Sequence, residues 1–175
     1  MTVSHLERTV SALQVRFPHG VLAAVEFRGD LTLQIDSASL LAVCQYLRDE
    51  PTLAYNVLVD IGAVDYSPQE PRFALFYIVC ALVHNTRLRL KVLLPGTEPV
   101  APSITGIWPS ANWPEREAFD MMGIGFDGHP DLRRILMPAD WEGHPHRKDY
   151  PLGYEEVQFT FNKREIDARK KYATS

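Results

Sequence analysis

Proline is distributed unevenly along this chain, and its distribution limits where long regular elements can form. Nine of the thirteen prolines lie between Pro95 and Pro151. Proline lacks a backbone N–H and has a fixed φ, so it interrupts helices and central strands. The sequence therefore predicts a regular domain over residues 1–100 and an irregular, proline-rich C-terminal arm over residues 101–175. Because an irregular stretch of this length is unstable alone, we expect it to pack on the chain's own sheet and on another protein.

The first hundred residues carry two kinds of apolar spacing. Apolar residues three or four apart are typical of amphipathic helices, whereas β-branched or alternating stretches are typical of strands. The predicted fold class is α+β, with a mixed or antiparallel sheet and the helices on one face. Ser37 or Ser39 is expected to cap the second helix. Helices are predicted over Val3–Phe17 and Leu40–Arg48, and strands over Val21–Phe27, Leu31–Ile35, Tyr55–Val64, Arg72–Val83, Thr86–Leu94 and Tyr154–Asn162.

Composition excludes several classes of protein. A net charge of −4 and a pI near 5.8 argue against a general nucleic-acid surface. The longest apolar run, Phe73–Val83, is too short to span a membrane, and the N-terminus lacks a signal-peptide layout. Cys44 and Cys80 form no C-x-x-C pair, so the sequence indicates neither an iron–sulfur site nor a disulfide framework. We expect a soluble chain in a reducing, cytoplasmic compartment.

The stretch from Ser110 to Leu152 concentrates tryptophan, histidine and charge of both signs. A sequence that needed only to fold would not gather these residue types in one place. The tryptophans of this stretch are typical of a core or of interface anchors. The candidate interface residues are Trp113, Glu115, Arg116, Glu117, Asp120, His129, Asp131, Arg133, Arg134, Trp141, Arg147, Lys148 and Asp149.

The beginning of this stretch predicts a short, highly charged helix over Trp113–Met122. Asn112 can act as its N-cap, with Glu115 three residues later completing a capping box. Gly123 is a typical C-terminal stop.

An exposed ion pair and a buried apolar stripe are expected on this helix. Arg116 and Asp120 are four residues apart and are predicted to pair along its surface. Phe119 and Met122 are three apart and are predicted to form its buried stripe.

The next six residues, Gly123 to Gly128, match the pattern G-x-G-x-x-G. A dinucleotide-binding fingerprint requires a strand before the glycines and a helix beginning within them. Here the glycines follow a predicted helix and run into His129-Pro130. We therefore interpret this segment as a turn that changes the chain direction.

No catalytic grouping emerges from the same stretch. His144 and His146 are two residues apart and suggest a metal site, but no cysteine lies nearby, so hydrogen bonding in a packed loop is the favoured interpretation. Glu115 and Glu117 do not face each other on a helix and so do not form an acid–base pair.

A further hypothesis is that basic residues of this stretch bind a phosphate group. Arg133-Arg134 and Arg147-Lys148 are the cations available to it. Because Asp131 and Asp149 lie close in the sequence, salt-bridged interface charge is the preferred interpretation.

The same residues resemble the signature of a known family, the 30 kDa (C) subunit of respiratory complex I. The likeness is dense over about forty residues and general in the upstream part. Met122 stands where the family has phenylalanine, and His146 where an aliphatic residue is usual. The residues that carry it are Glu115-Arg116-Glu117, Asp120-Met121-Met122-Gly123, Gly128-His129-Pro130-Asp131-Leu132-Arg133-Arg134-Ile135-Leu136, Asp140-Trp141-Glu142-Gly143-His144-Pro145 and Arg147-Lys148-Asp149-Tyr150-Pro151-Leu152.

This resemblance implies a non-catalytic structural subunit in the hydrophilic arm of a proton-translocating NADH:quinone oxidoreductase. It implies that the chain braces the 49 kDa (D) subunit, whose junction with the B subunit forms the quinone site. The flavin (FMN) and the iron–sulfur clusters are then expected in other subunits, with no cofactor in this chain. The expected location is peripheral, on the cytoplasmic side of the bacterial inner membrane.

Two alternatives remain open at this point. Related energy-converting hydrogenases, and quinone oxidoreductases fed by donors other than NADH, contain subunits with the same signature. A free small-molecule enzyme that holds an anion through the Arg133 to Lys148 cluster is the second alternative. The proteins that copurify with the chain, and their cofactors, would distinguish these hypotheses.

Overall fold

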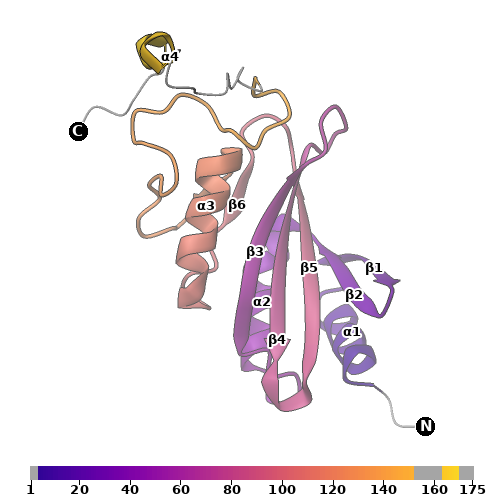
Figure 1. Cartoon of the computed structure of the whole chain (residues 1–175). Helices are drawn as coiled ribbons and strands as arrows, with labels where there is room; N and C mark the ends of the chain where they lie inside the picture. The colour runs from indigo at the N-terminus through magenta and orange to yellow at the C-terminus, as the bar shows by residue number, and fades with distance from the viewer. Residues whose placement is uncertain (1–3, 152–162, 170–175) are drawn as a thin grey trace.

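The computed structural model of the chain describes residues 4–151 and 163–169 (Figure 1). The strand predicted over Tyr154–Asn162 lies outside the described residues. A short helix, α4 (Lys163–Arg169), follows that gap.

The regular elements of the first part of the chain agree with the sequence pattern. Each predicted helix and strand up to Leu94 is present, with ends that differ from the prediction by at most two residues. The strands on either side of Arg28-Gly29 pair antiparallel, so these residues form the turn of a β-hairpin. The elements are α1 (His5–Arg16), β1 (Val21–Phe27), β2 (Asp30–Ile35), α2 (Leu40–Asp49), β3 (Val57–Asp65), β4 (Phe73–Ala81) and β5 (Thr86–Leu94).

The five strands form one sheet in the order β1-β2-β5-β4-β3. The pair β2–β5 is parallel, and every other pair is antiparallel. The sheet is therefore mixed, and the predicted α+β class is confirmed. The strand β3 lies at one edge, and this edge faces the C-terminal half of the chain (Figure 1).

The hydrophobic core lies between the sheet and its helices. Alternate residues of β5, Leu88 to Leu94, point into it as predicted. Helix α2 lies behind the central strands in Figure 1 and contributes Leu40, Val43 and Leu47. Burial of such side chains contributes about 25 cal/mol for each Å² removed from water.

The start of α2 differs from its prediction. Ser39 is the N-cap, but its side chain makes no capping hydrogen bond. The carboxylate of Asp36 instead accepts from the N–H of Ala38, at the start of the 3₁₀ helix η1 (Ser37–Ser39) that leads into α2. An aspartate cap one turn earlier replaces the expected serine cap.

The region after Leu94 contains more regular structure than its prolines indicate. A 3₁₀ helix, η3 (Pro109–Ala111), leads into α3 (Asn112–Met122). The strands β6 (Val100–Pro102) and β7 (Gly125–Asp127) pair in parallel. The glycine pattern thus holds a short strand as well as a turn, and it follows a helix as expected.

Several side chains of this region enter the same core as the sheet. Ile104, Trp108, Ile124 and Phe126 are buried within it. Residues 129–150, by contrast, form no helix or strand. We call them the docked segment. The division into domains at residue 100 stays a prediction.

Candidate functional site

Helix α3 turns three charged side chains toward the protein interior. Glu115 and Asp120 are fully buried, and Arg116 is also buried. The predicted stripe of Phe119 and Met122 is therefore only part of the buried face, and Phe119 itself is half-buried. Buried charge is tolerated only where it is paired or hydrogen-bonded, so the partners of these residues determine the role of the helix.

Glu115 holds the turn that precedes α3. One carboxylate oxygen accepts a hydrogen bond from the hydroxyl of Ser103 at 2.6 Å, and the other accepts from the N–H of Ile104 at 2.8 Å. The predicted capping box is wrong, because Asn112 lies inside the helix and the N-cap residue Ala111 makes no side-chain bond. Burial raises the pKa of Glu115 above its usual value, and the two hydrogen bonds oppose this shift.

Asp120 fixes the middle of the docked segment. Its Oδ2 accepts hydrogen bonds from three consecutive backbone N–H groups, those of residues 135–137, at 2.8 to 3.0 Å. Its Oδ1 accepts from the guanidinium of Arg134 at 2.6 Å. Burial acts to raise the pKa of Asp120, but the hydrogen bonds outweigh it and the pKa lies below its usual value.

Arg116 does not pair with Asp120, so that prediction is wrong. The Arg116 Nε donates to the carbonyl of Arg133 at 3.1 Å, and its guanidinium lies 5.0 Å from the centre of the Trp113 ring. Both charged side chains instead bind backbone groups of the docked segment. Helix α3 therefore binds this segment mainly through its peptide groups.

The neighbouring arginines Arg133 and Arg134 have different environments. Arg133 forms a two-bond pair with Asp131 at the surface, where the Arg133 side chain is 75% exposed. The Arg134 side chain is only 16% exposed. Its guanidinium pairs with the Asp120 carboxylate, and its Nη2 donates to the carbonyl of Gly143 at 2.9 Å. The expected pairing with Asp131 is confirmed for Arg133, whereas Arg134 uses a partner on α3.

His129 ties the beginning of the docked segment to the beginning of α3. Its ring Nδ1 accepts from the N–H of Asp131 at 3.0 Å, so Nε2 carries the proton and donates to the carbonyl of Asn112 at 3.3 Å. The imidazole is fully buried and lies 3.9 Å from the Glu115 carboxylate.

The C-terminus of α3 is covered by two cationic or polar side chains. Arg147 donates from Nε to the carbonyl of Met122 at 2.6 Å and from Nη2 to that of Gly123 at 3.2 Å. His144 donates from Nδ1 to the carbonyl of Asp120 at 2.9 Å. The last carbonyls of a helix lack partners within it, and positive charge is favourable there. Hydrogen bonding is thus the role the structure gives to His144.

Replacing Gly123 with alanine should destabilise the chain by about 1–3 kcal/mol. Gly123 ends α3 with a φ of 67°, in the left-handed region, and an added Cβ would collide with Arg147 and His144. Chemical denaturation measures the loss. Gly128→Ala is the matched control, since its φ is 77° but its Cβ would meet open space. Equal losses in both variants would contradict the steric role of the covering side chains.

A second anchor lies where β3 and β4 meet. The carboxylate of Asp65 accepts two hydrogen bonds from Arg72, at 3.0 and 2.7 Å, and one from the backbone N–H of Lys148 at 2.9 Å. The Arg72 guanidinium and these N–H groups hold the pKa of Asp65 well below its usual value, although burial acts the other way. Sequence reasoning missed both Asp65 and Arg72.

The end of the docked segment is bound through this anchor. Asp149 pairs with Arg72 at 2.9 Å, not with Arg147 or Lys148 as the sequence suggested. The Lys148 ammonium donates to the carbonyl of Ser67 at 3.2 Å. The four candidate cations therefore bind carboxylate and carbonyl groups of this chain and do not converge on a shared phosphate position.

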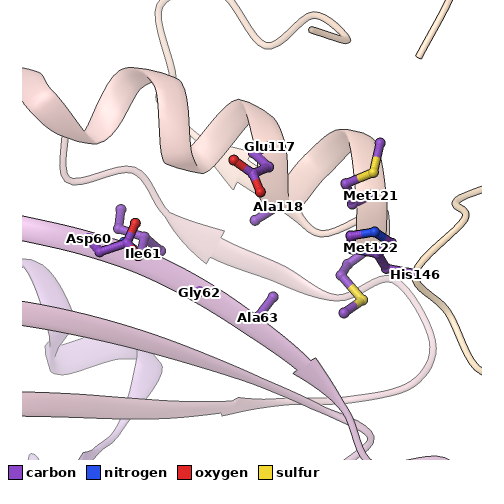
Figure 2. A pocket seen from close by; sticks show the side chains of 9 residues that line it. All are labelled: Asp60, Ile61, Gly62, Ala63, Glu117, Ala118, Met121, Met122 and His146. Atoms are coloured by element: carbon purple, nitrogen blue, oxygen red, sulfur yellow. The ribbon is translucent and has the colours of Figure 1, made fainter. Parts of the chain in front are cut away.

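A cavity of about 260 Å³ lies between α3 and the edge strand β3, and residues of both elements line it (Figure 2). Asp60 of β3 and Glu117 of α3 line it from opposite sides, and His146 lies at one end. Both acids and His146 are exposed. Gly62 forms part of its floor, with open space above its Cα.

The two tryptophans of the docked region differ in exposure. Trp113 is 64% exposed on α3, so it is not a core residue of the described chain. Trp141 is half-buried, and its indole N–H has no hydrogen-bond partner within the described residues.

Residues 4–151 and 163–169 contain no group of three or more His, Cys, Asp or Glu side chains arranged to hold a metal ion. The helices in this described part are too short or too polar to cross a membrane.

Comparisons with known proteins give a consistent result. The profile of the family described as "Respiratory-chain NADH dehydrogenase, 30 Kd subunit" matches residues 33–156. The C subunit of NADH-quinone oxidoreductase from Roseiflexus sp. (strain RS-1) is 49% identical over 168 residues, which cover 96% of this chain and 94% of the relative. The protein of the same name from Geotalea uraniireducens (strain Rf4) is 45% identical over 145 residues, covering 83% and 87% of the two chains.

Two solved structures share the fold. A chain titled "Nqo5 of the trypsin-resistant fragment (1-134) in P63 form" is 29% identical, with a TM-score of 0.62 over 73% of this chain and 99% of that one. A chain from the membrane-bound sulfane sulfur reductase, an archaeal respiratory membrane complex, has a TM-score of 0.71 over 97% and 95%. At 20% identity the second likeness shows the fold alone.

Proposed function

Because the chain belongs to the family of the 30 kDa subunit of respiratory-chain NADH dehydrogenase, we propose that it is the non-catalytic C subunit of an NADH-quinone oxidoreductase. Its place is in the hydrophilic peripheral arm of the complex. There it braces the 49 kDa (D) subunit next to the B subunit, where the quinone site forms. Electron transfer from NADH to quinone is the work of the complex as a whole.

One observation supports a bracing role above all. Several charged side chains of the docked segment and α3 bind the chain's own backbone: Asp120 accepts from three consecutive N–H groups, and Arg147 donates to two carbonyls. Charged groups used in this way fix the position of a loop, because each buried partner would be costly to leave unpaired. The segment therefore reaches the complex already shaped, which lowers the entropy cost of association.

The redox cofactors are assigned to other subunits. Cys44 and Cys80 are both buried, and burial raises the pKa of the Cys44 thiol. A thiol must lose its proton to ligate an iron–sulfur cluster, so these residues are poor ligands. FMN and the clusters are expected in neighbouring subunits, and this chain is expected on the cytoplasmic side of the inner membrane, held there by the complex.

Neither alternative gains support from a specific contact. The fold is shared with a chain of a sulfane sulfur reductase, but the fold does not determine the electron donor. The anion-binding enzyme requires free cations, whereas Arg134 and Arg147 are occupied by groups of this chain.

Copurification tests the proposal. The chain, expressed from its own host with a C-terminal tag, should bring with it the D and B subunits, FMN and iron, and NADH should reduce quinone in that preparation. The isolated folded chain should be colourless and should not bind NADH. Stoichiometric iron or flavin in the isolated chain would overturn the assignment. A complex that reacts with hydrogen, or takes electrons from a donor other than NADH, would support the related complexes.

The same preparation tests the interface. Trp113→Ala should reduce recovery of the complex by about tenfold or more, since exposed tryptophans are frequent interface anchors. Val15→Ala removes another highly exposed apolar side chain, on α1, and should leave recovery unchanged. Equal recovery for both variants would show that Trp113 lies outside the interface.

A further inference from the structure

The sheet has a second face, opposite the core, that carries an unusual set of side chains. Residues directly opposite each other on paired strands point to the same face. The strand register therefore places one row of five residues across all five strands on this face: Val25, Thr32, Arg89, Ile78 and Asp60. Helix α2 lies on the other side of the strands (Figure 1), and its buried residues belong to the core.

Large apolar side chains remain accessible on this face. Val25 is 58% exposed and Phe27 is 68% exposed. Ile78, in the row named above, and Phe76, in the next row on the same face, are half-buried. The water-facing side of a sheet normally carries polar residues. Apolar side chains at these four positions therefore indicate a surface that binds another protein.

Three cations run along the strand that crosses the middle of this face. Arg87, Arg89 and Lys91 alternate with the buried leucines of β5. The Arg87 side chain is exposed and makes no ion pair or hydrogen bond within the described residues, whereas the Lys91 ammonium lies over the rings of Tyr66 and Phe76. The Arg89 guanidinium lies 3.7 Å from the Asp30 carboxylate and donates a long hydrogen bond of 3.4 Å to the Thr32 hydroxyl, and such exposed contacts contribute little to stability.

A small hollow of about 100 Å³ lies between these cations. It is lined by Arg87 and Arg89, with Ile78 and Asp30 at its sides. The hollow has room for one carboxylate side chain, and the two guanidinium groups beside it can each form forked hydrogen bonds to such a group.

We propose that this face binds an amphipathic helix of another subunit, with acidic side chains toward Arg87, Arg89 and Lys91 and apolar side chains toward Val25, Phe27 and Ile78. The spacing favours a helix. Residues two apart on a strand are about 6.8 Å apart, and residues four apart on a helix rise about 6 Å. On a helix that lies parallel to β5, carboxylates at every fourth position therefore match the spacing of Arg87, Arg89 and Lys91. The inference rests on the proposed function, because it takes its partner from the assembled complex.

Photocrosslinking in the full complex tests this inference. Phe27→p-benzoylphenylalanine places a reactive ketone on the face with little change of shape, and mass spectrometry identifies the crosslinked peptide. We expect a segment of a different subunit with Asp or Glu residues three or four apart. A crosslink to a basic segment, to a second copy of this chain or to lipid would overturn the proposal, as would the absence of a product from assembled complex.

Charge reversal provides the second arm. Arg87→Glu with Arg89→Glu should lower the crosslink yield by about tenfold or more, because like charges then face each other. Arg8→Glu with Arg16→Glu, on α1, changes the net charge equally and should keep the yield. Arg87→Gln is a milder variant if the double reversal reduces folding, judged by circular dichroism. An unchanged yield in the folded face variants would overturn the proposal. If the chain without any substitution is not recovered with the complex, that result would instead count against the proposed function.

Discussion

Replacing Arg134 with alanine should lower the free energy of unfolding by about 3–5 kcal/mol. Arg134 is the only side-chain cation within hydrogen-bond distance of the fully buried Asp120 carboxylate among the described residues, at 2.6 Å, and it also binds the carbonyl of Gly143. Its loss leaves a buried negative charge that only backbone N–H groups stabilise. Urea denaturation of the isolated chain, followed by circular dichroism, measures the effect.

The adjacent residue is the matched control. Arg133→Ala should leave the stability of the isolated chain unchanged within error, because its pair with Asp131 is exposed to solvent. Arg134→Lys should be intermediate, since an ammonium cannot reproduce two contacts made by one guanidinium. Equal losses at both positions would show that the buried contact with Asp120 is not what matters.

The Arg134 substitution should also change how much of the complex assembles. Arg134→Ala is expected to reduce the amount of assembled complex, while the complex that does assemble keeps near-normal electron transfer per cluster. Normal assembly with collapsed turnover would instead indicate an anion substrate. Complex abundance and activity per complex, measured in the same membranes, distinguish the two.

Replacing Asp65 with asparagine should cost about 3 kcal/mol or more at neutral pH. The carboxylate of Asp65 accepts four hydrogen bonds, two from Arg72 and one each from the N–H groups of Ser67 and Lys148. An amide keeps one acceptor oxygen but places an NH₂ group where the other oxygen received donors. One end of the docked segment would then lose its attachment to the sheet.

This variant should also change the response to acid. The pKa of Asp65 is lowered in the folded chain, so its stabilising effect is complete above the unfolded pKa of about 3.9 and is lost as the pH falls below that value. Wild-type stability should therefore fall between about pH 5 and pH 2 more steeply than that of Asp65→Asn.

Asp149→Asn is the control for this experiment. Asp149 binds the same guanidinium of Arg72, but its side chain is 59% exposed, against 2% for Asp65. It should lose much less stability and keep the acid response of the wild type. An Asp65→Asn chain with unchanged acid sensitivity would show that other carboxylates control the transition.

Local patterns in the sequence were sufficient to predict the five strands of the main sheet. The strand predicted over Thr86–Leu94 has the same bounds in the structure, because its alternation reflects one buried and one exposed face. The three-residue strands β6 and β7 had no such pattern, since too few residues alternate in them. The order of strands in the sheet was also outside the prediction, because it depends on pairing between distant segments.

The charged partners of the site were predicted less well. Rules for pairs four residues apart suggested Arg116 with Asp120, but Asp120 binds groups 14 to 17 residues away. Asp65 and Lys148 are further apart still. One signal was available: Ile135-Leu136-Met137 lies in an irregular segment whose N–H groups have no partner within a helix or strand and so require other acceptors, and Asp120 is a carboxylate on a predicted helix.

The hydrogen bond from Lys148 to Asp65 joins residues that are 83 positions apart. The entropy cost of closing a flexible loop grows only with the logarithm of its length, by about 0.6 kcal/mol for each doubling. Both Asp65 and its partner Arg72 are held by the β3–β4 hairpin, so the receiving end of this bond is fixed by residues close to Asp65 in the sequence. The intervening chain is therefore free to gain or lose surface residues, for example at the turn after β4, while the docked segment keeps its attachment.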